Sequence, residues 1–182
     1  MTMLPPSRPG WPREKVASKL FDGGVRVTVA LLGVRGYYRD TMGKPGVNDR
    51  GIYDDAIFLN SPSGCMAFNA NVDPSIFRPG VATLAPGLHI YKKGKHGISR
   101  PGGGYPAFRP ATPDEGLPVI RDGQAGMSRG IAINIHRGAR NSTSSLGCQT
   151  IHPDQWDAFR SLAYSEMDRH GQKTIPYLLI NV

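Results

Sequence analysis

Glycine and proline interrupt this chain so often that long regular elements are confined to a few stretches. The 182 residues include 23 glycines and 16 prolines, and both residue types mark turns and element boundaries. Apolar residues make up 39%, which at this length suffices for one hydrophobic core. The pattern therefore predicts a single domain of short strands and many turns, and it argues against a helical bundle.

Short apolar or alternating runs between these turns predict the strands. Residues 54–60 and 66–69 form the clearest pair, because residues 61–64 have the composition of a hairpin turn. Further strands are expected at residues 25–32, 117–120, 130–135 and 174–182.

The turn at residues 86–87 leads into another alternating strand. This strand has Leu88 and Ile90 on one face and His89 and Tyr91 on the other. The stretch that follows, residues 93–118, is long and rich in glycine and proline. We expect it to be a loop that forms a flap or rim beside a cleft.

One amphipathic helix is predicted near the end of the chain. Pro153 fits its first turn, and Gly171 is a typical terminator. Residues 14–20 predict one or two further helical turns. Residues 1–13 contain four prolines and are expected to form a flexible arm outside a single domain of residues 14–182. The apolar stripe of the long helix comprises Trp156, Phe159, Ala163 and Met167.

A net charge of +8 favours polyanionic partners such as nucleic acid, an anionic membrane or a bacterial cell wall. The positive residues are spread along the sequence without a basic run or a nucleic-acid-binding module, so nucleic acid is not an expected partner. No stretch approaches the roughly 18 apolar residues of a membrane span, and residues 1–13 lack the apolar segment of a signal peptide. We therefore expect synthesis in the cytoplasm without a signal peptide, and no stable membrane insertion.

A histidine and a cysteine lie at the two ends of a short polar segment. Residues 130–135 lead into His136, and a Ser-x-Gly-Cys motif begins at Ser145 and ends at Cys148. A thiolate is a strong nucleophile, an imidazole can take the thiol proton, and backbone amides can stabilise an oxyanion. The pattern predicts acyl transfer, with Cys148 as nucleophile, His136 as base and Gly147 beside the oxyanion hole.

A third group must orient the imidazole of His136, and the sequence leaves three alternatives open. These are Asn134, Ser144 and a backbone carbonyl near residues 137–138. The other cysteine, Cys65, is expected to be a buried structural thiol. A catalytic thiol must stay free, which argues against a disulfide between the two cysteines.

His152 follows Cys148 by four residues and has two interpretations, assistance to the site or capping of the helix, of which capping is favoured. Zinc binding by His136, Cys148 and His152 is conceivable from the ligand types. No second pair of ligands at the usual spacing supports it, so we expect neither a metal nor a cofactor.

The motifs His136-Arg137-Gly138 and Ser145-Leu146-Gly147-Cys148 resemble the signature of the L,D-transpeptidase catalytic domain family. The turn and strand at residues 83–90, and the order of the motifs, are also similar to that family. The resemblance covers residues 78–151 and is nearest to a phage or prophage lineage. It implies a mainly β, β-rich α+β fold: a mixed β-sheet sandwich with one C-terminal helix packed near the active-site cysteine.

The same resemblance implies an endolysin-like hydrolase that cleaves a stem-peptide or cross-link bond of bacterial peptidoglycan through a Cys148 acyl-enzyme. Such a protein would act in the periplasm or cell wall and depend on a separate lysis or secretion protein for release. One alternative is an L,D-transpeptidase or L,D-carboxypeptidase that acts as an interbacterial effector. Another is a non-catalytic component that binds the cell wall or belongs to a virion.

Three departures from the family pattern concern the substrate side of the site. Leu146 stands where the family commonly has histidine, Thr150 stands where it has arginine or asparagine, and the spacer between histidine and serine is short. These changes imply a specialised member and favour hydrolysis. Planar arginine side chains can bind a substrate carboxylate. The residues expected to contact substrate are Arg137, Gly138, Arg140, Ser145, His89 and Thr150.

Overall fold

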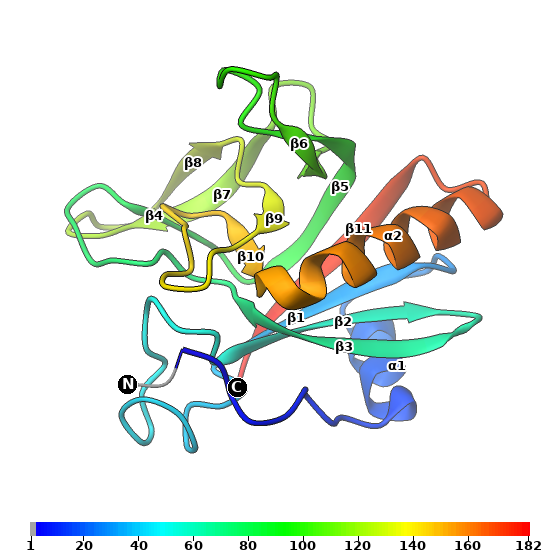
Figure 1. Ribbon diagram of the computed structural model, residues 1–182, viewed down its shortest axis with the longest axis horizontal. Helices are drawn as coiled ribbons and strands as arrows, with labels where there is room; N and C mark the ends of the chain where they lie inside the picture. Colours follow the sequence, from blue (N-terminus) through cyan, green and yellow to red (C-terminus); the bar gives the residue numbers. More distant parts are fainter. Residues whose placement is uncertain (1–2) are drawn as a thin grey trace.

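A computed structural model describes residues 3–182 of the chain (Figure 1). Within this range the chain forms two α-helices and eleven strands. The helices are α1 (Arg13–Asp22) and α2 (Pro153–Arg169). The strands are β1 (Ala30–Arg35), β2 (Asp55–Ser61), β3 (Gly64–Asn71), β4 (Ala82–Leu84), β5 (Gly87–His96), β6 (Tyr105–Pro110), β7 (Gly116–Arg121), β8 (Met127–Ile131), β9 (Ile135–Arg137), β10 (Gln149–Ile151) and β11 (Thr174–Asn181).

Eight strands close into a barrel in the order β1-β11-β5-β6-β9-β10-β3-β2. The pairs β1–β11 and β9–β10 are parallel and the other pairs are antiparallel, so the sheet is mixed. Strands β4, β7 and β8 form a separate three-stranded sheet (Figure 1). The mainly β class is confirmed. The main sheet, however, closes on itself through the contact between Phe108 and Ile135, and so it is a barrel instead of the expected sandwich.

Strand β1 is buried on both faces, which explains its nearly continuous apolar sequence. Leu31 belongs to the cluster that also contains the apolar stripe of α2. Leu32 packs on the opposite side with Val16 and Leu20 of α1. Each large aliphatic side chain removed from water in this way contributes about 1.5–3 kcal/mol. The two helices thus cover different faces of the same strands.

Helix α2 follows the sequence expectation closely. Pro153 is its first residue, and the His152 side chain caps the helix by accepting a hydrogen bond from the Asp154 amide at 3.3 Å. This contact confirms the capping interpretation of His152. Gly171, with φ of 62°, follows the end of the helix. The predicted stripe of Trp156, Phe159, Ala163 and Met167 is buried.

The N-terminal arm packs against the barrel from residue 3 onward. Trp11 stacks on Phe58 with ring centroids 5.8 Å apart, and the carbonyl of Ser7 accepts a hydrogen bond from Asn69 Nδ2 at 3.1 Å. Residues 1–2 of the expected flexible arm lie outside the described residues. The part that is described is bound to the barrel surface, and α1 begins at its end.

The expected flap at residues 93–118 is wrong. Strand β5 continues to His96, where it pairs with Tyr105 at the start of β6, so most of this stretch forms a hairpin of the barrel. The strand expected at residues 130–135 is also interrupted. Ala132 has φ of 54°, which ends β8 and delays β9 until Ile135.

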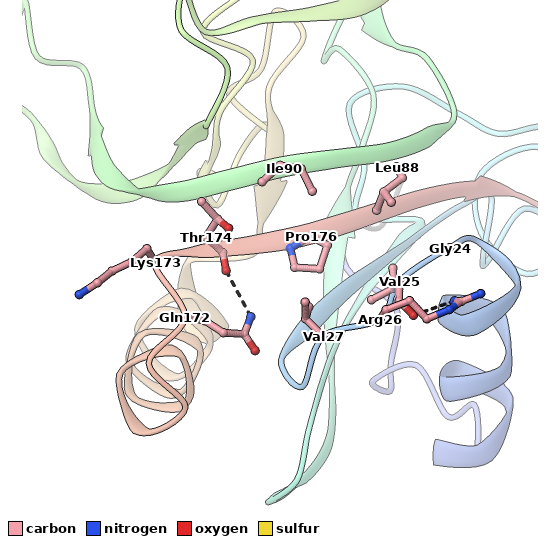
Figure 2. A pocket seen from close by; sticks show the side chains of 10 residues that line it. All are labelled: Gly24, Val25, Arg26, Val27, Leu88, Ile90, Gln172, Lys173, Thr174 and Pro176. Carbon is pink, nitrogen blue, oxygen red and sulfur yellow. Dashed lines mark hydrogen bonds between the residues drawn. The ribbon is translucent and has the colours of Figure 1, made fainter.

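Strand β5 reverses the usual relation between residue type and burial. His89 and Tyr91 are buried, whereas Leu88 and Ile90 are 42% and 39% exposed. Figure 2 shows these two side chains beside Pro176 in a groove on the outer face. His89 Nε2 donates a hydrogen bond to the Ala85 carbonyl at 2.9 Å. The ring of His89 is thus buried and engaged by the backbone, and the expected contact of His89 with substrate stays a prediction.

Neither helix within residues 3–182 is both long and apolar enough to cross a lipid bilayer.

Candidate active site

The backbone brings the predicted histidine and cysteine together through two neighbouring parallel strands. His136 on β9 pairs in register with Thr150 on β10, two residues after Cys148. The reversal at Ala132 then turns the chain so that the Asn134 amide donates to Cys148 Sγ at 3.4 Å, while the thiol points to the Ala132 carbonyl at 3.6 Å. A non-glycine residue with positive φ costs about 1–3 kcal/mol. This strain is located directly beside the thiol.

A second imidazole completes the site. Ligand atoms of His96, His136 and Cys148 all lie within 4.8 Å of one another. The ring of His96, at the end of β5, stacks on that of His136 with centroids 3.8 Å apart and an interplanar angle of 17°. The thiol therefore has two possible proton acceptors nearby, of which the sequence indicated one.

Hydrogen bonds fix the orientation of His136. Its Nδ1 lies 2.8 Å from the Arg137 carbonyl oxygen and 3.1 Å from the Tyr105 hydroxyl. Because a carbonyl only accepts, Nδ1 carries the proton, and Nε2 remains free to take one. The backbone carbonyl is thus the orienting group among the three alternatives. Asn134 instead has its side-chain amide 3.1 Å from His96 Nδ1, and Ser144 is exposed.

Burial keeps the reacting groups uncharged at rest. Burial, assisted by the neighbouring His96, lowers the pKa of His136 to about 3. Burial also raises the pKa of the Cys148 thiol to about 11, opposed by the Asn134 amide and by Arg109. A neutral imidazole is the form that can accept a proton. These two pKa values keep the resting proton on the Cys148 sulfur.

The loop before the thiol is held by Ser145. Its hydroxyl accepts a hydrogen bond from the Gly147 amide at 3.0 Å and donates one to the Cys148 carbonyl at 2.6 Å. The Gly147 amide is therefore occupied, whereas the Cys148 amide has no hydrogen-bond partner among residues 3–182. Ser145 is buried, so it shapes the loop and does not present a surface to substrate as expected.

Gly147 is required by the space around it. Its φ of 138° is unfavourable for other residues, and a Cβ there would lie 2.6 Å from the carbonyl oxygen of Ala82 on β4. The loop of the thiol thus packs directly against the second sheet.

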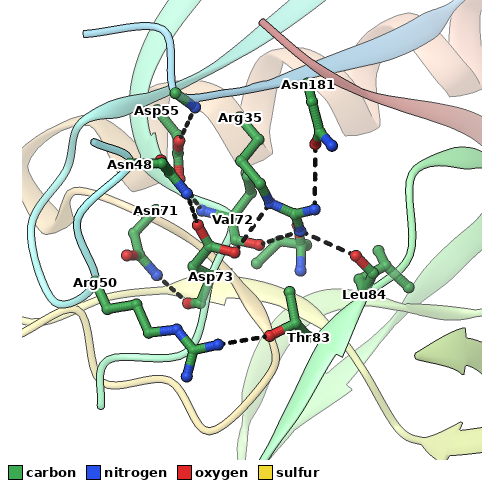
Figure 3. Close-up of polar contacts among 12 residues, drawn as sticks. Arg35, Asn48, Arg50, Asp55, Asn71, Val72, Asp73, Thr83, Leu84 and Asn181 are labelled. Carbon is green, nitrogen blue, oxygen red and sulfur yellow. Dashed lines mark hydrogen bonds and ion pairs between the residues drawn. The ribbon is translucent and has the colours of Figure 1, made fainter. Parts of the chain in front are cut away.

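A buried polar network fixes β4 in that position (Figure 3). Arg35 at the end of β1 contacts Asp73 at 2.9 Å and donates to the Leu84 carbonyl at 2.9 Å. Arg50 donates to the Thr83 hydroxyl at 3.1 Å. Charge-assisted bonds of this kind are stronger than neutral ones. The network therefore anchors the strand that forms the wall beside Gly147.

A positively charged groove runs along this wall. Ala82, Ile133 and Leu146 line it, together with Arg78 and Arg121. Arg121 is held by bonds that include one to the Gly80 carbonyl at 2.9 Å. Leu146, two residues before Cys148, is the part of the thiol-bearing loop that lines the groove.

The remaining residues expected to contact substrate have different environments. Arg137 is exposed, with its guanidinium 5.2 Å from the centre of the Tyr105 ring. Arg140 is exposed but is paired with Asp154 at 2.8 Å. Arg137 is thus accessible beside the imidazoles, whereas Arg140 is directed to the start of α2.

Gly138 and Thr150 are both buried. A Cβ on Gly138 would lie 2.1 Å from the Tyr53 hydroxyl, and Thr150 donates toward the Asn71 carbonyl at 3.4 Å. Both residues serve packing and strand pairing in this structure, and their expected contact with substrate stays a prediction.

The cysteines are both free. The ligand combination weighed from the sequence was His136, Cys148 and His152; the structure brings His96 to the thiol and uses His152 as the helix cap. Sequence reasoning missed His96 and Tyr105 because both fell in the stretch interpreted as a loop. The only sequence signal that could have pointed to these two residues as part of the site was their type, an imidazole and a phenol.

Comparison of the chain with protein-family models, curated proteins and solved structures gave no match.

Proposed function

We propose that this protein is a cysteine-dependent hydrolase of bacterial peptidoglycan with an endolysin-like role. The observation that carries the proposal is the thiol of Cys148 within 4.8 Å of the His136 imidazole, whose Nδ1 is held by a backbone carbonyl at 2.8 Å. A nucleophile, a base and a group that orients the base are the components of acyl transfer. The choice of peptidoglycan rests on the motifs that resemble L,D-transpeptidases and on the net charge of +8.

The chemistry would proceed in two steps. In the first, His136 Nε2 takes the proton of Cys148 while Sγ attacks the carbonyl carbon of a peptide bond. The free amide of Cys148 is suited to stabilise the oxyanion, and the amine product leaves with the proton from His136. In the second step, His136 takes a proton from a water molecule as the water oxygen attacks the thioester carbonyl. The C–S bond then breaks, the carboxylic acid is released, and His136 returns the proton to the Cys148 sulfur.

The groove beside Gly147 is the proposed substrate channel. Peptidoglycan stem peptides carry carboxylates, and Arg78 and Arg121 give the groove a matching positive charge. Leu146 and Ile133 supply apolar contacts on the same wall. The exposed Arg137 is available on the side of the imidazoles.

Mass spectrometry of purified peptidoglycan after digestion tests the proposal and identifies the bond cleaved. The wild-type protein should create new peptide ends, and the Cys148→Ala and His136→Ala variants should not. Cys65→Ala is the matched control and should retain activity. Full activity of Cys148→Ala would refute the mechanism.

Two further readouts separate the alternatives. Incorporation of an added amine acceptor into the products would identify a transpeptidase. Wall binding by wild-type protein and by Cys148→Ala alike, without new peptide ends in either case, would identify a non-catalytic wall or virion component. The site of action proposed is the cell wall, reached with the help of a separate lysis or secretion protein.

A further inference from the structure

We propose that His96, His136 and Cys148 form a three-ligand site for Zn²⁺, and that its occupation switches off the thiol chemistry. Their ligand atoms lie within 4.8 Å of one another. Zinc bonds of 2.0–2.3 Å in a tetrahedron separate ligand atoms by about 3.3–3.8 Å. The three groups therefore need to approach by about 1 Å and the stacked rings need to tilt, movements that side-chain rotation can supply.

The donor set suits this metal. Imidazole nitrogen and thiolate sulfur are the common ligands of zinc, and three protein ligands leave the fourth position to water. Imidazole must be neutral to bind a metal, and burial lowers the pKa of both His96 and His136. Both rings are therefore in the binding form at neutral pH.

Hydrogen-bonding groups lie beside Nδ1 of both rings. His136 Nδ1 is held by the Arg137 carbonyl at 2.8 Å, and His96 Nδ1 lies 3.1 Å from the side-chain amide of Asn134. The Asn134 Oδ1 atom is buried without a hydrogen-bond partner. Rotation of this amide by 180° lets Oδ1 accept the His96 Nδ1 proton and leaves Nε2 free. Outer hydrogen bonds of this kind are typical of zinc-bound histidine.

Charge at the site sets the affinity. Arg100 and Arg109 act on His96 as nearby cations, which opposes a divalent ion, but Arg109 is neutralised by its ion pair with Glu115. Binding of Zn²⁺ by the thiol releases one proton and forms a zinc–thiolate bond. This step consumes the nucleophile and occupies the lone pairs of both imidazoles. A loaded site consequently has neither a nucleophile nor a base for acyl transfer.

Cobalt(II) titration of the purified full-length protein tests the site without any activity measurement. The expected result is a thiolate-to-cobalt charge-transfer band with one equivalent bound, lost on addition of zinc. Cys148→Ser should lose the band, and His96→Ala should weaken binding by more than the 10- to 100-fold typical of an outer-shell change. Cys65→Ser is the matched control and should match wild type.

Several outcomes would overturn the proposal. The first is the absence of the charge-transfer band in wild type, and the second is its persistence in Cys148→Ser. The third is unchanged metal affinity in both His96→Ala and His96→Gln, of which the second keeps a larger side chain. Circular dichroism checks that every variant is folded. Zinc-loaded protein should also lose peptide release, and a chelator should restore it. Undiminished activity with zinc bound contradicts the inference, yet it leaves the hydrolase proposal to its own test with metal-free protein.

Discussion

The two Gly-Cys pairs in this chain have similar glycine φ angles but different surroundings. Gly64, before Cys65, and Gly147, before Cys148, have φ of 143° and 138°. Burial raises the pKa of both thiols. A Cβ added to Gly64 would meet no other atom within 4 Å. A Cβ added to Gly147 would lie 2.6 Å from the backbone carbonyl oxygen of Ala82. The two pairs therefore differ in the space around the glycine, although its φ angle is similar in both.

The partners of the two sulfur atoms differ as well. Cys148 has two imidazoles within 4.8 Å. Cys65 lies on β3 in a largely apolar hollow with Met66 and Leu162. A thiol reacts as a nucleophile at neutral pH only when a base or a stabilised thiolate is available. The comparison shows that neighbouring side chains from other strands, and not the Gly-Cys sequence, would make one cysteine a catalyst.

Removal of the base should give the largest effect. His136→Ala leaves His96 as the one imidazole beside Cys148. The side chain of Asn134 lies at Nδ1 of His96, whereas a backbone carbonyl holds Nδ1 of His136. We expect kcat/KM for peptide release to fall by about 10²–10⁴. His170→Ala, at the far end of α2, serves as the control and should stay near wild type. A fall of less than threefold in His136→Ala would show that His136 is not the base.

The glycines provide a matched test of the packing difference. Gly147→Ala should lower the free energy of unfolding by about 1–3 kcal/mol more than Gly64→Ala, because the new Cβ meets the Ala82 carbonyl. Displacement of the thiol by about 1 Å should also cost roughly 100-fold in activity. Denaturant unfolding and peptide release measure the two effects. Equal losses in both variants would contradict the packing argument.

The second imidazole should control the pH dependence. With a His136 pKa of about 3, the base stays neutral at every pH above about 4, so metal-free wild type should show no acid limb near pH 6.5. His96→Ala removes one cause of the lowered His136 pKa and exposes the His136 ring to water. The pKa of His136 should therefore rise toward the usual value in this variant. We expect about tenfold lower kcat/KM at pH 5 than at pH 7 in this variant. Superimposable pH profiles would argue against the role of His96.

The same lowered pKa has a consequence for stability. The unfolded chain binds a proton at His136 near pH 6.5, and the folded protein does so only near pH 3. Acid therefore favours unfolding, and the contribution of His136 to stability is lost as the pH falls through this range.

The smallest effect is expected at the other thiol. Cys65→Ser should leave peptide release within about twofold of wild type and change stability by less than about 1 kcal/mol, because the side chain is only half-buried. A thermal melt measures the change in stability, and the peptide-release assay measures the change in activity. A loss comparable to that of Cys148→Ser would remove the functional distinction between the two cysteines.

The elements predicted correctly from the sequence depend on local signals. The hairpin turn at residues 61–64 and the stripe of α2 are encoded within a few residues of one another. The association of His136 with Cys148 was also predicted, from the types of the two residues and the short polar segment between them. The backbone carbonyl that orients His136 was one of three alternatives that the sequence could not rank.

Features that depend on distant strands were missed. Alternation in β5 indicated two faces but not which one the barrel encloses. The barrel buries Tyr91 because its hydroxyl donates to the Ile133 carbonyl at 2.8 Å, and Leu88 remains outside. His96 reaches the thiol through the pairing of β5 with β6 and of β6 with β9. Such a register cannot be read from any single segment.

The place of β11 between β1 and β5 determines when the site can exist during protein synthesis. Leu31 pairs with Tyr177, whose hydroxyl donates to Gln149, the residue after Cys148, at 3.1 Å. A nascent chain that has not yet reached β11 has open edges on β1 and β5 and lacks this support beside the thiol. We expect any reactivity of Cys148 to require that β11 has inserted between β1 and β5.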